Sequence, residues 1–235
     1  MLYSLCQKFI SLVFEGDELY TIVGKGSDAA SSESWTAVMM DRSSRFIVDQ
    51  RCGSQDAALF KSVMGTVCQY LSETQELSFF SDAERRYGKT LFDLCAQTLG
   101  TGKRGRLAQT LPAAVKVRVK NKGDQKHKGG PKRPKYQAPI KEHRQTHQQL
   151  NQSEIHANHV EANNAAMRRR NSAFRRCTNT YSKTVAGLQR TLDVHWVIHN
   201  FVRKHFTTAQ VPAVAMGILP AALSLQRNYP GRENK

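Results

Sequence analysis

The stretch VFEGDELYTIVG (residues 13–24) is predicted to be a β-strand that ends at a glycine. A later strand, LSFFSD (residues 77–82), ends in an acid and follows a segment with the apolar spacing of an amphipathic helix, residues 56–71. A strand that returns after a helix lies parallel to its neighbour through a right-handed crossover. LSFFSD is therefore expected beside the first strand near the middle of a sheet, with Asp17 and Asp82 as neighbours.

The remaining elements complete a mixed α/β fold. WTAVMMD (residues 35–41) and RFIVDQRCG (residues 45–53) are predicted strands joined by a polar turn, and Asp56 is a candidate N-cap for the helix that follows. Another helix is expected over residues 87–96. Helices resume after residue 151, with an amphipathic helix that runs to about His205 and a PAVAMGIL stretch that closes the core.

The charge of the chain is its most unusual global property. The 235 residues carry a formal net charge of +16, although the hydrophobic content of 40% is ordinary for a folded protein. One sizeable core is therefore expected, with nucleic acid as the first candidate partner and an anionic membrane surface as the second.

The positive charge concentrates in residues 101–152, which are rich in Gly, Pro, Lys and Arg. The alternation of Val115, Val117 and Val119 suggests one exposed basic strand in this segment, and the remainder is expected to become ordered on its partner. The sequence thus divides into residues 1–100, the first part of the folded domain, residues 101–152, an inserted arm that contacts nucleic acid, and residues 153–235, a helical part.

No segment predicts a membrane protein. No apolar run approaches the roughly 20 residues that a bilayer span needs. The first 14 residues resemble a signal peptide only faintly, because Gln7 and Lys8 interrupt the apolar stretch, and they are predicted to form a helix or leader strand. The 5 cysteines are odd in number and never spaced as CxxC. Reduced thiols in a cytoplasm are therefore expected, and a zinc ribbon is not.

The acids suggest phosphodiester chemistry. Glu161 is a lone acid in HANHVEANNAAMRRRNSAFRR (residues 156–176), where arginines follow it closely. Two-metal phosphoryl transfer needs about three carboxylates around ions roughly 3.5–4 Å apart. Asp17, Asp82 and Glu161 are predicted to be those carboxylates and the metal ligands. The residues predicted to bind DNA are Lys116, Arg118, Lys120, Lys132, Arg133, Lys135, Arg168, Arg169, Arg170, Arg175 and Arg176.

Other acids compete for these places. Asp41 could replace Asp17, although an aspartate in a turn commonly accepts hydrogen bonds from backbone donors. Glu154 could replace Glu161, seven residues later on nearly the same helix face, but it is expected to cap or begin that helix. Glu18 should point to the face of its strand opposite Asp17.

The histidines and tryptophans carry weaker predictions. His156 and His159 flank Glu161 and could assist proton transfer or contact phosphate, or they could simply lie on the helix surface. His195 and His199 lack the HExxH pattern and are expected to face the core or partner helices, without a zinc site. Trp35 and Trp196 are predicted to be core residues rather than platforms for base stacking.

Several segments in order resemble the catalytic part of a bacterial DDE transposase of the insertion-sequence-one family. They are GDELYTIVGK (16–25), SWTAVMMDRSSRFIV (34–48), FFSDAERRY (79–87), HVEANNAAMRRRNSAFRRCTNTYSK (159–183) and HNFVRKHFTTAQVPAVAMGIL (199–219). The resemblance covers nearly the whole chain. It implies an RNase H-like fold, with a mixed sheet flanked by helices and a basic insertion between the fourth strand and the catalytic helix.

The resemblance also implies a function, namely metal-dependent DNA cleavage and strand transfer with Mg²⁺ or Mn²⁺. Asp17 and Asp82 match the two aspartates of the family, and Glu161 matches its glutamate. The partners would be the ends of the mobile element and the target DNA, with a homo-oligomer assembled on DNA in the bacterial cytoplasm, associated with the nucleoid.

The chain differs from the family in two places. The gap between Asp82 and Glu161 is longer than in the simplest members and is filled by the basic segment. Almost nothing precedes the first strand, where the family usually carries a zinc-binding and helix-turn-helix region. A separate chain could supply that region, or the sequence could be a second reading-frame product, a truncated copy or a decayed element.

Two non-catalytic functions remain open on the sequence alone. The chain could be a basic DNA- or RNA-binding module whose acids are structural. It could also be an inactive transposase fragment that inhibits the full-length enzyme by occupying DNA or mixed oligomers. Metal-dependent nicking of DNA separates the enzyme from both alternatives.

Overall fold

The fold was taken from a computed structural model, which describes residues 9–24, 33–72, 74–82, 84–100, 107–121, 135–137, 142–146, 152–175 and 179–225. The strands are β1 (Phe9–Tyr20), β2 (Trp35–Asp41), β3 (Ile47–Gly53), β4 (Thr74–Asp82), β5 (Gln97–Leu99), β6 (Ala108–Thr110), β7 (Val115–Asn121) and β8 (Lys135–Gln137). The α-helices are α1 (Ala57–Gln69), α2 (Arg86–Cys95), α3 (Asn158–Arg170), α4 (Val185–Val197) and α5 (Pro212–Ala215). The shorter helices are η3 (Tyr70–Ser72), η4 (Arg144–Thr146), η5 (Gln152–Glu154), η6 (Ser172–Phe174) and the π-helix η7 (Ile198–Val202).

A mixed sheet in the order β3-β2-β1-β4-β7-β8 forms the centre of the molecule. β1 pairs antiparallel with β2 and parallel with β4, with Gly16 opposite Ser81. The predicted parallel pairing of the first and fourth strands is therefore confirmed. The return is made through α1, which begins where predicted because the Asp56 carboxylate accepts hydrogen bonds from the backbone N–H groups of Ala58 and Leu59.

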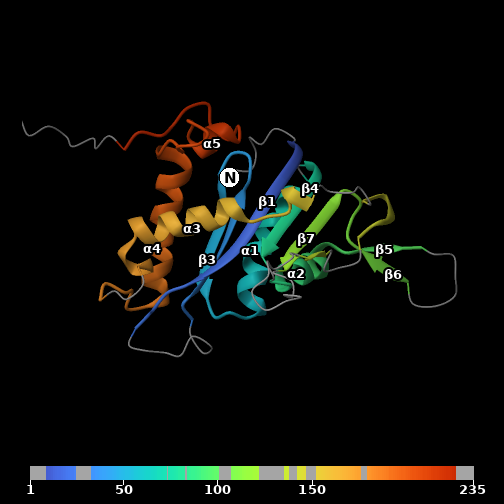
Figure 1. Ribbon diagram of the computed structural model, residues 1–235, viewed down its shortest axis with the longest axis horizontal. Coiled ribbons are helices and arrows are strands. Elements are labelled where there is room, and N and C mark those ends of the chain that lie inside the picture. The colour runs from blue at the N-terminus through green and yellow to red at the C-terminus, as the bar shows by residue number, and fades with distance from the viewer. Residues whose placement is uncertain are drawn as a thin grey trace, which may run out of the picture.

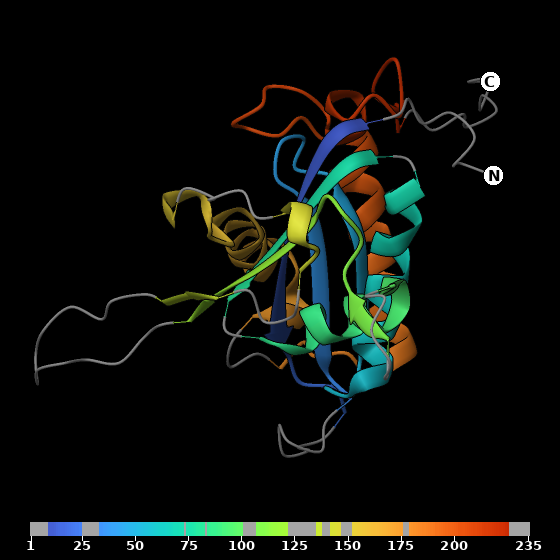
Figure 2. The ribbon, with the colours of Figure 1, turned by 90° about the vertical axis from the view of Figure 1, so that its right-hand side faces the viewer.

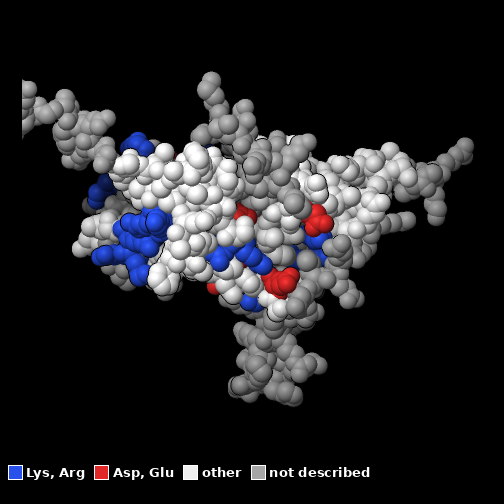
Figure 3. Space-filling view, turned by 90° about the horizontal axis from the view of Figure 1, so that it is seen from above, with Lys and Arg blue, Asp and Glu red and all other residues white. Residues whose placement is uncertain are grey.

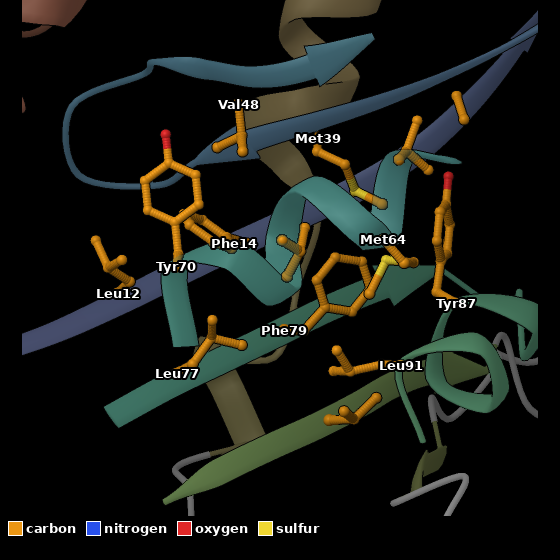
Figure 4. Close-up of a cluster of buried hydrophobic side chains, with 14 of the residues drawn as sticks. Leu12, Phe14, Met39, Val48, Met64, Tyr70, Leu77, Phe79, Tyr87 and Leu91 are labelled. Atoms are coloured by element: carbon orange, nitrogen blue, oxygen red, sulfur yellow. The ribbon is translucent and has the colours of Figure 1, made fainter. Parts of the chain in front are cut away.

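One face of the sheet packs on α1 and α2. The core there mixes aromatic and aliphatic side chains, among them Phe14 of β1, Phe79 of β4 and Met64 of α1, which are fully buried (Figure 4). Tyr87 of α2 stacks edge-on against Phe60, with ring centroids 4.9 Å apart. The Phe79 ring packs directly over Gly16, where a Cβ atom would lie 2.6 Å from the ring, so this position favours a glycine.

The opposite face is covered by α3 and α4. Figure 2 shows the sheet nearly edge-on, with α3 on one side and α1 and α2 on the other. A second apolar cluster joins Val38 and Met40 of β2 to Val160 and Met167 of α3 and to Leu188 and Leu192 of α4. In Figure 1, α3 crosses in front of the strands, and it packs against β1 and β2. The sheet is thus flanked by helices on both faces, as predicted.

β7 differs from the prediction of an exposed basic strand. It pairs parallel with β4, and the side chains of Val115, Val117 and Val119 are buried. The alternation marks a sheet strand whose valines face α1 and α2, while its basic residues face the α3 side. Residues 115–121 therefore belong to the central sheet and are not part of an arm.

The C-terminal helices agree with the sequence prediction. The amphipathic helix is realised as α4 and continues as the π-helix η7, where Asn200 is fully buried and bonds to the backbone of Ile47 through both side-chain polar atoms. Val211, Ala213 and Met216 are buried in and around α5 and close the core. Trp196 packs against both apolar clusters, and Trp35 packs against the one on the α1 side. Among the described helices, none is long and apolar enough to span a bilayer.

Candidate active site

Asp17 and Asp82 lie on adjacent strands and point to the same face of the sheet. Each follows directly after the paired residues Gly16 and Ser81, so the parallel register places the two aspartates side by side. Burial raises the pKa of Asp17, and the charge of Asp82 raises it further, whereas the side-chain amide of Asn164 opposes the rise by donating a 2.8 Å hydrogen bond to Oδ2. The predicted neighbourhood of Asp17 and Asp82 is therefore present in the structure.

Glu161 joins this pair from α3, although it lies 79 positions after Asp82 in the sequence. Its carboxyl group approaches that of Asp82, so the protonated form of Glu161 can donate a hydrogen bond to the Asp82 carboxylate. Partial burial, together with the negative charges of Asp82 and Asp17, raises the pKa of Glu161 to about 7. The three predicted acids are thus close enough to resist one another's ionisation, which is typical of carboxylates that share a cation.

The position of α3 explains why Glu161 reaches Asp82. Ala157, the residue before the helix, has no side chain to accept a hydrogen bond from the first turn. Glu15 of β1 replaces it, because its Oε2 atom accepts hydrogen bonds from the backbone N–H groups of His159 and Val160 at 2.9 and 3.1 Å. A carboxylate at a helix N-terminus satisfies free donors and also favours the helix dipole. Glu15 therefore fixes the end of α3 on the sheet.

Arg42 completes this anchor. Its Nε atom donates to Oε1 of Glu15 at 2.7 Å, and its two terminal nitrogens donate to the backbone carbonyls of Glu154 and His156. The guanidinium also stacks over the Phe80 ring, 4.7 Å from its centroid. Although burial alone would raise the pKa of Glu15, hydrogen bonding by His159 and the charge of Arg42 hold that pKa below its usual value.

The competing acids have other roles. Asp41 is buried, and its Oδ2 atom accepts hydrogen bonds from Ser43 and Ser44 within the turn after β2, so it is structural. Glu154 lies in η5 and does not begin α3, contrary to the prediction, since that helix starts at Asn158. Glu18 points to the opposite face of β1 as predicted, where burial beside Tyr87 raises the pKa of Glu18 to about 7.

A second cluster could also hold a cation. Among the described residues, only Glu15, His156 and His159 bring three ligand atoms within 4.8 Å of one another. Oε1 of Glu15, however, already faces the Arg42 guanidinium and His159 Nδ1, while Oε2 binds two backbone N–H groups. The acid of this cluster is therefore neutralised by the protein itself.

The carboxylates around Asp82 fit a hard divalent cation better. One buried oxygen of Asp82, Oδ1, has no hydrogen-bond partner among the described residues. Oxygen ligands are those preferred by Mg²⁺ and Mn²⁺. The ligand atoms of Asp17, Asp82 and Glu161 do not all lie within 4.8 Å of one another, whereas a pair of ions roughly 3.5–4 Å apart takes ligands from a wider volume than a single ion does.

The predicted DNA-binding residues fall into different environments. Lys116 is buried beside Glu76, and Arg118 pairs with the buried carboxylate of Glu142, so neither faces solvent as a free cation. Lys120 lies opposite Asp82 near the end of β7, and its charge acts on Glu161.

The other predicted DNA-binding residues lie on α3, follow it, or are not described. Arg168, Arg169 and Arg170 form the last turn of α3. Arg175 is exposed just after η6. The side chain of Lys135 and all of Lys132, Arg133 and Arg176 lie outside the described residues.

His195 and His199 face the interior, as predicted. Burial, together with nearby positive charges, lowers the pKa of each imidazole to about 4. His199 Nε2 lies 2.8 Å from the backbone carbonyl of Arg45, which ties η7 to the turn before β3. Both imidazoles are therefore neutral at physiological pH.

Sequence reasoning missed Glu15, Arg42 and Asn164. Glu15 and Asp17 alternate on one strand, so a period of two already places both acids on one face. Asn164 lies three positions after Glu161, and hence on a neighbouring part of the same helix face. Arg42 leaves no such signal, because its partners Glu15, Glu154 and His156 are distant in sequence.

Comparison with protein families and curated proteins did not identify a relative of this chain. No protein-family model matches the chain, and no significantly similar curated protein is found. The resemblance to insertion-sequence transposases therefore stays a prediction that rests on the motifs and on the arrangement of the acids.

Proposed function

We propose that this chain is the catalytic part of a DDE transposase with an RNase H-like fold, which cleaves DNA and transfers the cut strand. The observation that carries the proposal is the meeting of Asp17, Asp82 and Glu161 on one face of the sheet, where the pKa of Glu161 is raised to about 7. Such mutual repulsion is relieved when cations bind, and phosphodiester cleavage commonly uses carboxylates in this way.

The protein groups have separate roles in this proposal. Asp17, Asp82 and Glu161 would hold Mg²⁺ or Mn²⁺, which would make the attacking water or DNA 3′-hydroxyl easier to deprotonate and would offset the negative charge on the leaving oxygen. Asn164 orients Asp17 through its 2.8 Å hydrogen bond. Lys120 and Arg168 lie close enough to act electrostatically on Glu161 and Asp17 respectively. Both can balance the negative charge of a phosphate held at the acids.

A nicking assay tests the proposal. Supercoiled plasmid is incubated with the protein in Mg²⁺, Mn²⁺ or EDTA, and open circles are counted. The wild type should nick only with a divalent ion, and Asp82→Asn should lower the rate by at least about 100-fold, or roughly 2.7 kcal/mol of transition-state stabilisation. Glu154→Gln, an exposed acid that precedes α3, is the matched control and should keep the wild-type rate.

DNA affinity measured in EDTA separates the enzyme from a binding module. Asp82→Asn should bind DNA at least as tightly as the wild type, because one negative charge near the phosphates is lost. If wild-type protein binds DNA but never nicks it with either ion, the transposase proposal fails and the result supports a non-catalytic binding module. Inhibition of an active relative by mixing would then identify an inhibitory fragment.

A further inference from the structure

A cationic cavity lies on the flank of α3 that is turned away from the acids. Its volume is about 360 Å³, and it is bounded by α3 and by the loop that follows η7. Its lining includes Arg45 from the turn before β3, His199 from η7, Arg170 from α3 and Arg203 from the segment after η7. No acidic side chain is among the described residues that line it.

The cations of this cavity lack direct ion pairs within the described part of the chain, although the charges of Glu15 and Asp41 act on Arg45 from nearby. These cations are Arg45, Arg169, Arg170, Arg203 and Lys204. The Nη1 atom of Arg45 is buried and lacks a hydrogen-bond partner among the described residues. Viewed from above, Lys and Arg side chains gather on the α4 side, while the visible acids lie nearer the middle (Figure 3). Such a cavity is built for an anion.

An aromatic ring stands at the edge of the same cavity. Phe206 is 99% exposed, which is exceptional for a phenylalanine in an ordered loop. The loop is closed by backbone hydrogen bonds from His205 N to Gln210 O at 2.8 Å and from Ala209 N to His205 O at 2.9 Å. Phe206 is therefore held out toward solvent beside several cations, without an apolar surface of its own.

Phosphate-binding cations beside an open aromatic ring match single-stranded nucleic acid. In a duplex the faces of the bases are stacked on one another, whereas an unpaired base can stack on an aromatic side chain. We propose that this cavity binds a phosphate of single-stranded DNA and that a neighbouring base stacks on Phe206. The choice of DNA rests on the proposed function, because cleavage and strand transfer both release a strand end.

The last turn of α3 connects the cavity to the acids. Successive residues of a helix point about 100° apart. Arg168 acts on Asp17 on one flank, while Arg169 and Arg170 line the cavity on the other. The three arginines therefore form a basic path over the exposed side of α3, along which a strand can run from the carboxylates to Phe206.

Binding in EDTA tests the aromatic contact. Fluorescence anisotropy compares a blunt duplex with the same duplex carrying a short single-stranded overhang. The wild type should prefer the overhang, and Phe206→Leu should lose about tenfold in affinity for it while affinity for the blunt duplex stays the same. Phe206→Tyr, which keeps the ring, should keep the preference.

Two results would overturn this part of the proposal. One is an equal loss for Phe206→Leu on both duplexes, and the other is an unchanged preference when the overhang lacks its bases. An RNA overhang that binds more tightly, with the same dependence on Phe206, would overturn the choice of DNA.

The salt dependence of binding tests the phosphate contact. Arg170→Gln and Arg203→Gln should each lower the slope of log affinity against log salt by about 1 on the overhang substrate. Lys61→Gln on α1, across the sheet, is the control and should leave the slope unchanged. Unchanged slopes in both arginine variants would overturn the assignment of the cavity to a phosphate.

These outcomes are independent of the proposed catalysis, because no divalent ion is present. An overhang preference that depends on Phe206, in a protein that never nicks DNA, would preserve the cavity as a single-strand site and remove the transposase function. Nicking by a protein that shows no overhang preference would support the transposase function and remove the single-strand site.

Discussion

Two acidic sites on the same face of β1 lie only two residues apart, and they differ in how their charge is balanced. Glu15 is fully buried, yet Arg42, two backbone N–H groups and His159 hold its pKa below the usual value. At Asp17 the next acids are Asp82 and Glu161, and the pKa of Asp17 and that of Glu161 are both raised. The protein thus balances the negative charge of Glu15 with its own groups, whereas the negative charges of Asp17, Asp82 and Glu161 are not fully balanced.

This difference separates a structural acid from a functional one. A buried charge that is fully paired ties elements together, and here Glu15 ties α3 to β1 and β2. A group of carboxylates that is not paired costs stability and persists where it binds something. The site at Glu15 therefore positions α3, and in the proposed function the acids around Asp82 bind the cations.

The largest expected effect comes from removing the paired acid. Glu15→Ala leaves Arg42 without its carboxylate and the first turn of α3 without an acceptor, so the free energy of unfolding should fall by about 3–5 kcal/mol. Urea denaturation measures the change. Glu154→Ala, exposed and close in space, is the control and should stay within about 0.5 kcal/mol of the wild type. A fall in the free energy of unfolding of less than about 1 kcal/mol for Glu15→Ala would contradict the role of Glu15 as the anchor of α3.

The residue between the two acids gives the next effect. Gly16→Ala would bring a Cβ atom to 2.6 Å from the buried Phe79 ring and 3.1 Å from Met39 Sδ. Displacing the buried Phe79 ring from its position over β1 should cost about 1–3 kcal/mol in the free energy of unfolding. Gly65→Ala on α1 meets no atom within 4 Å and is expected to stabilise by about 0.5–1 kcal/mol. Equal changes in the free energy of unfolding for Gly16→Ala and Gly65→Ala would contradict the close packing of the Phe79 ring over Gly16.

The smallest effect has the opposite sign and depends on pH. The pKa of Glu161 is about 7 in the folded protein and 4.5 without its neighbours. The folded state then binds more protons between these values, so stability falls as pH rises through this window. Glu161→Gln should raise the free energy of unfolding at pH 8 by about 1 kcal/mol or less, since exposure screens the repulsion, and should change nothing at pH 4.

Thermal unfolding at both pH values measures this gain, which corresponds to at most about 2–4 °C. The control Glu154→Gln should show no gain at either pH. A Glu161→Gln protein stabilised equally at pH 4 and pH 8 would show that the effect does not come from ionisation.

Part of this arrangement could be predicted from the sequence. The order strand, helix, strand placed Asp17 beside Asp82, because parallel pairing through a crossover follows from local patterns and handedness. The burial of Val117 could not be predicted from its basic neighbours, since a strand whose other face carries Lys116 and Arg118 resembles an exposed one. Those cations are instead paired with Glu76 and Glu142, which only the fold brings near.

The anchor of α3 escaped prediction for the same reason. Glu15 caps a helix that begins 143 positions later, at Asn158. Arg42 can bond to the carbonyls of Glu154 and His156 only when the segment before α3 lies against β2. Long-range contacts of this kind carry no local periodicity, whereas Glu161 could be singled out because it is the lone acid among arginines.

Binding of Mn²⁺, followed through the electron paramagnetic resonance signal of the free ion, tests most directly which of the two acidic sites takes a cation. The wild type should bind Mn²⁺, Asp82→Asn should weaken that binding by at least about tenfold, and His156→Ala should leave it unchanged. The reverse pattern, with binding lost in His156→Ala and kept in Asp82→Asn, would move the metal to the Glu15 cluster and contradict the catalytic role of Asp17, Asp82 and Glu161.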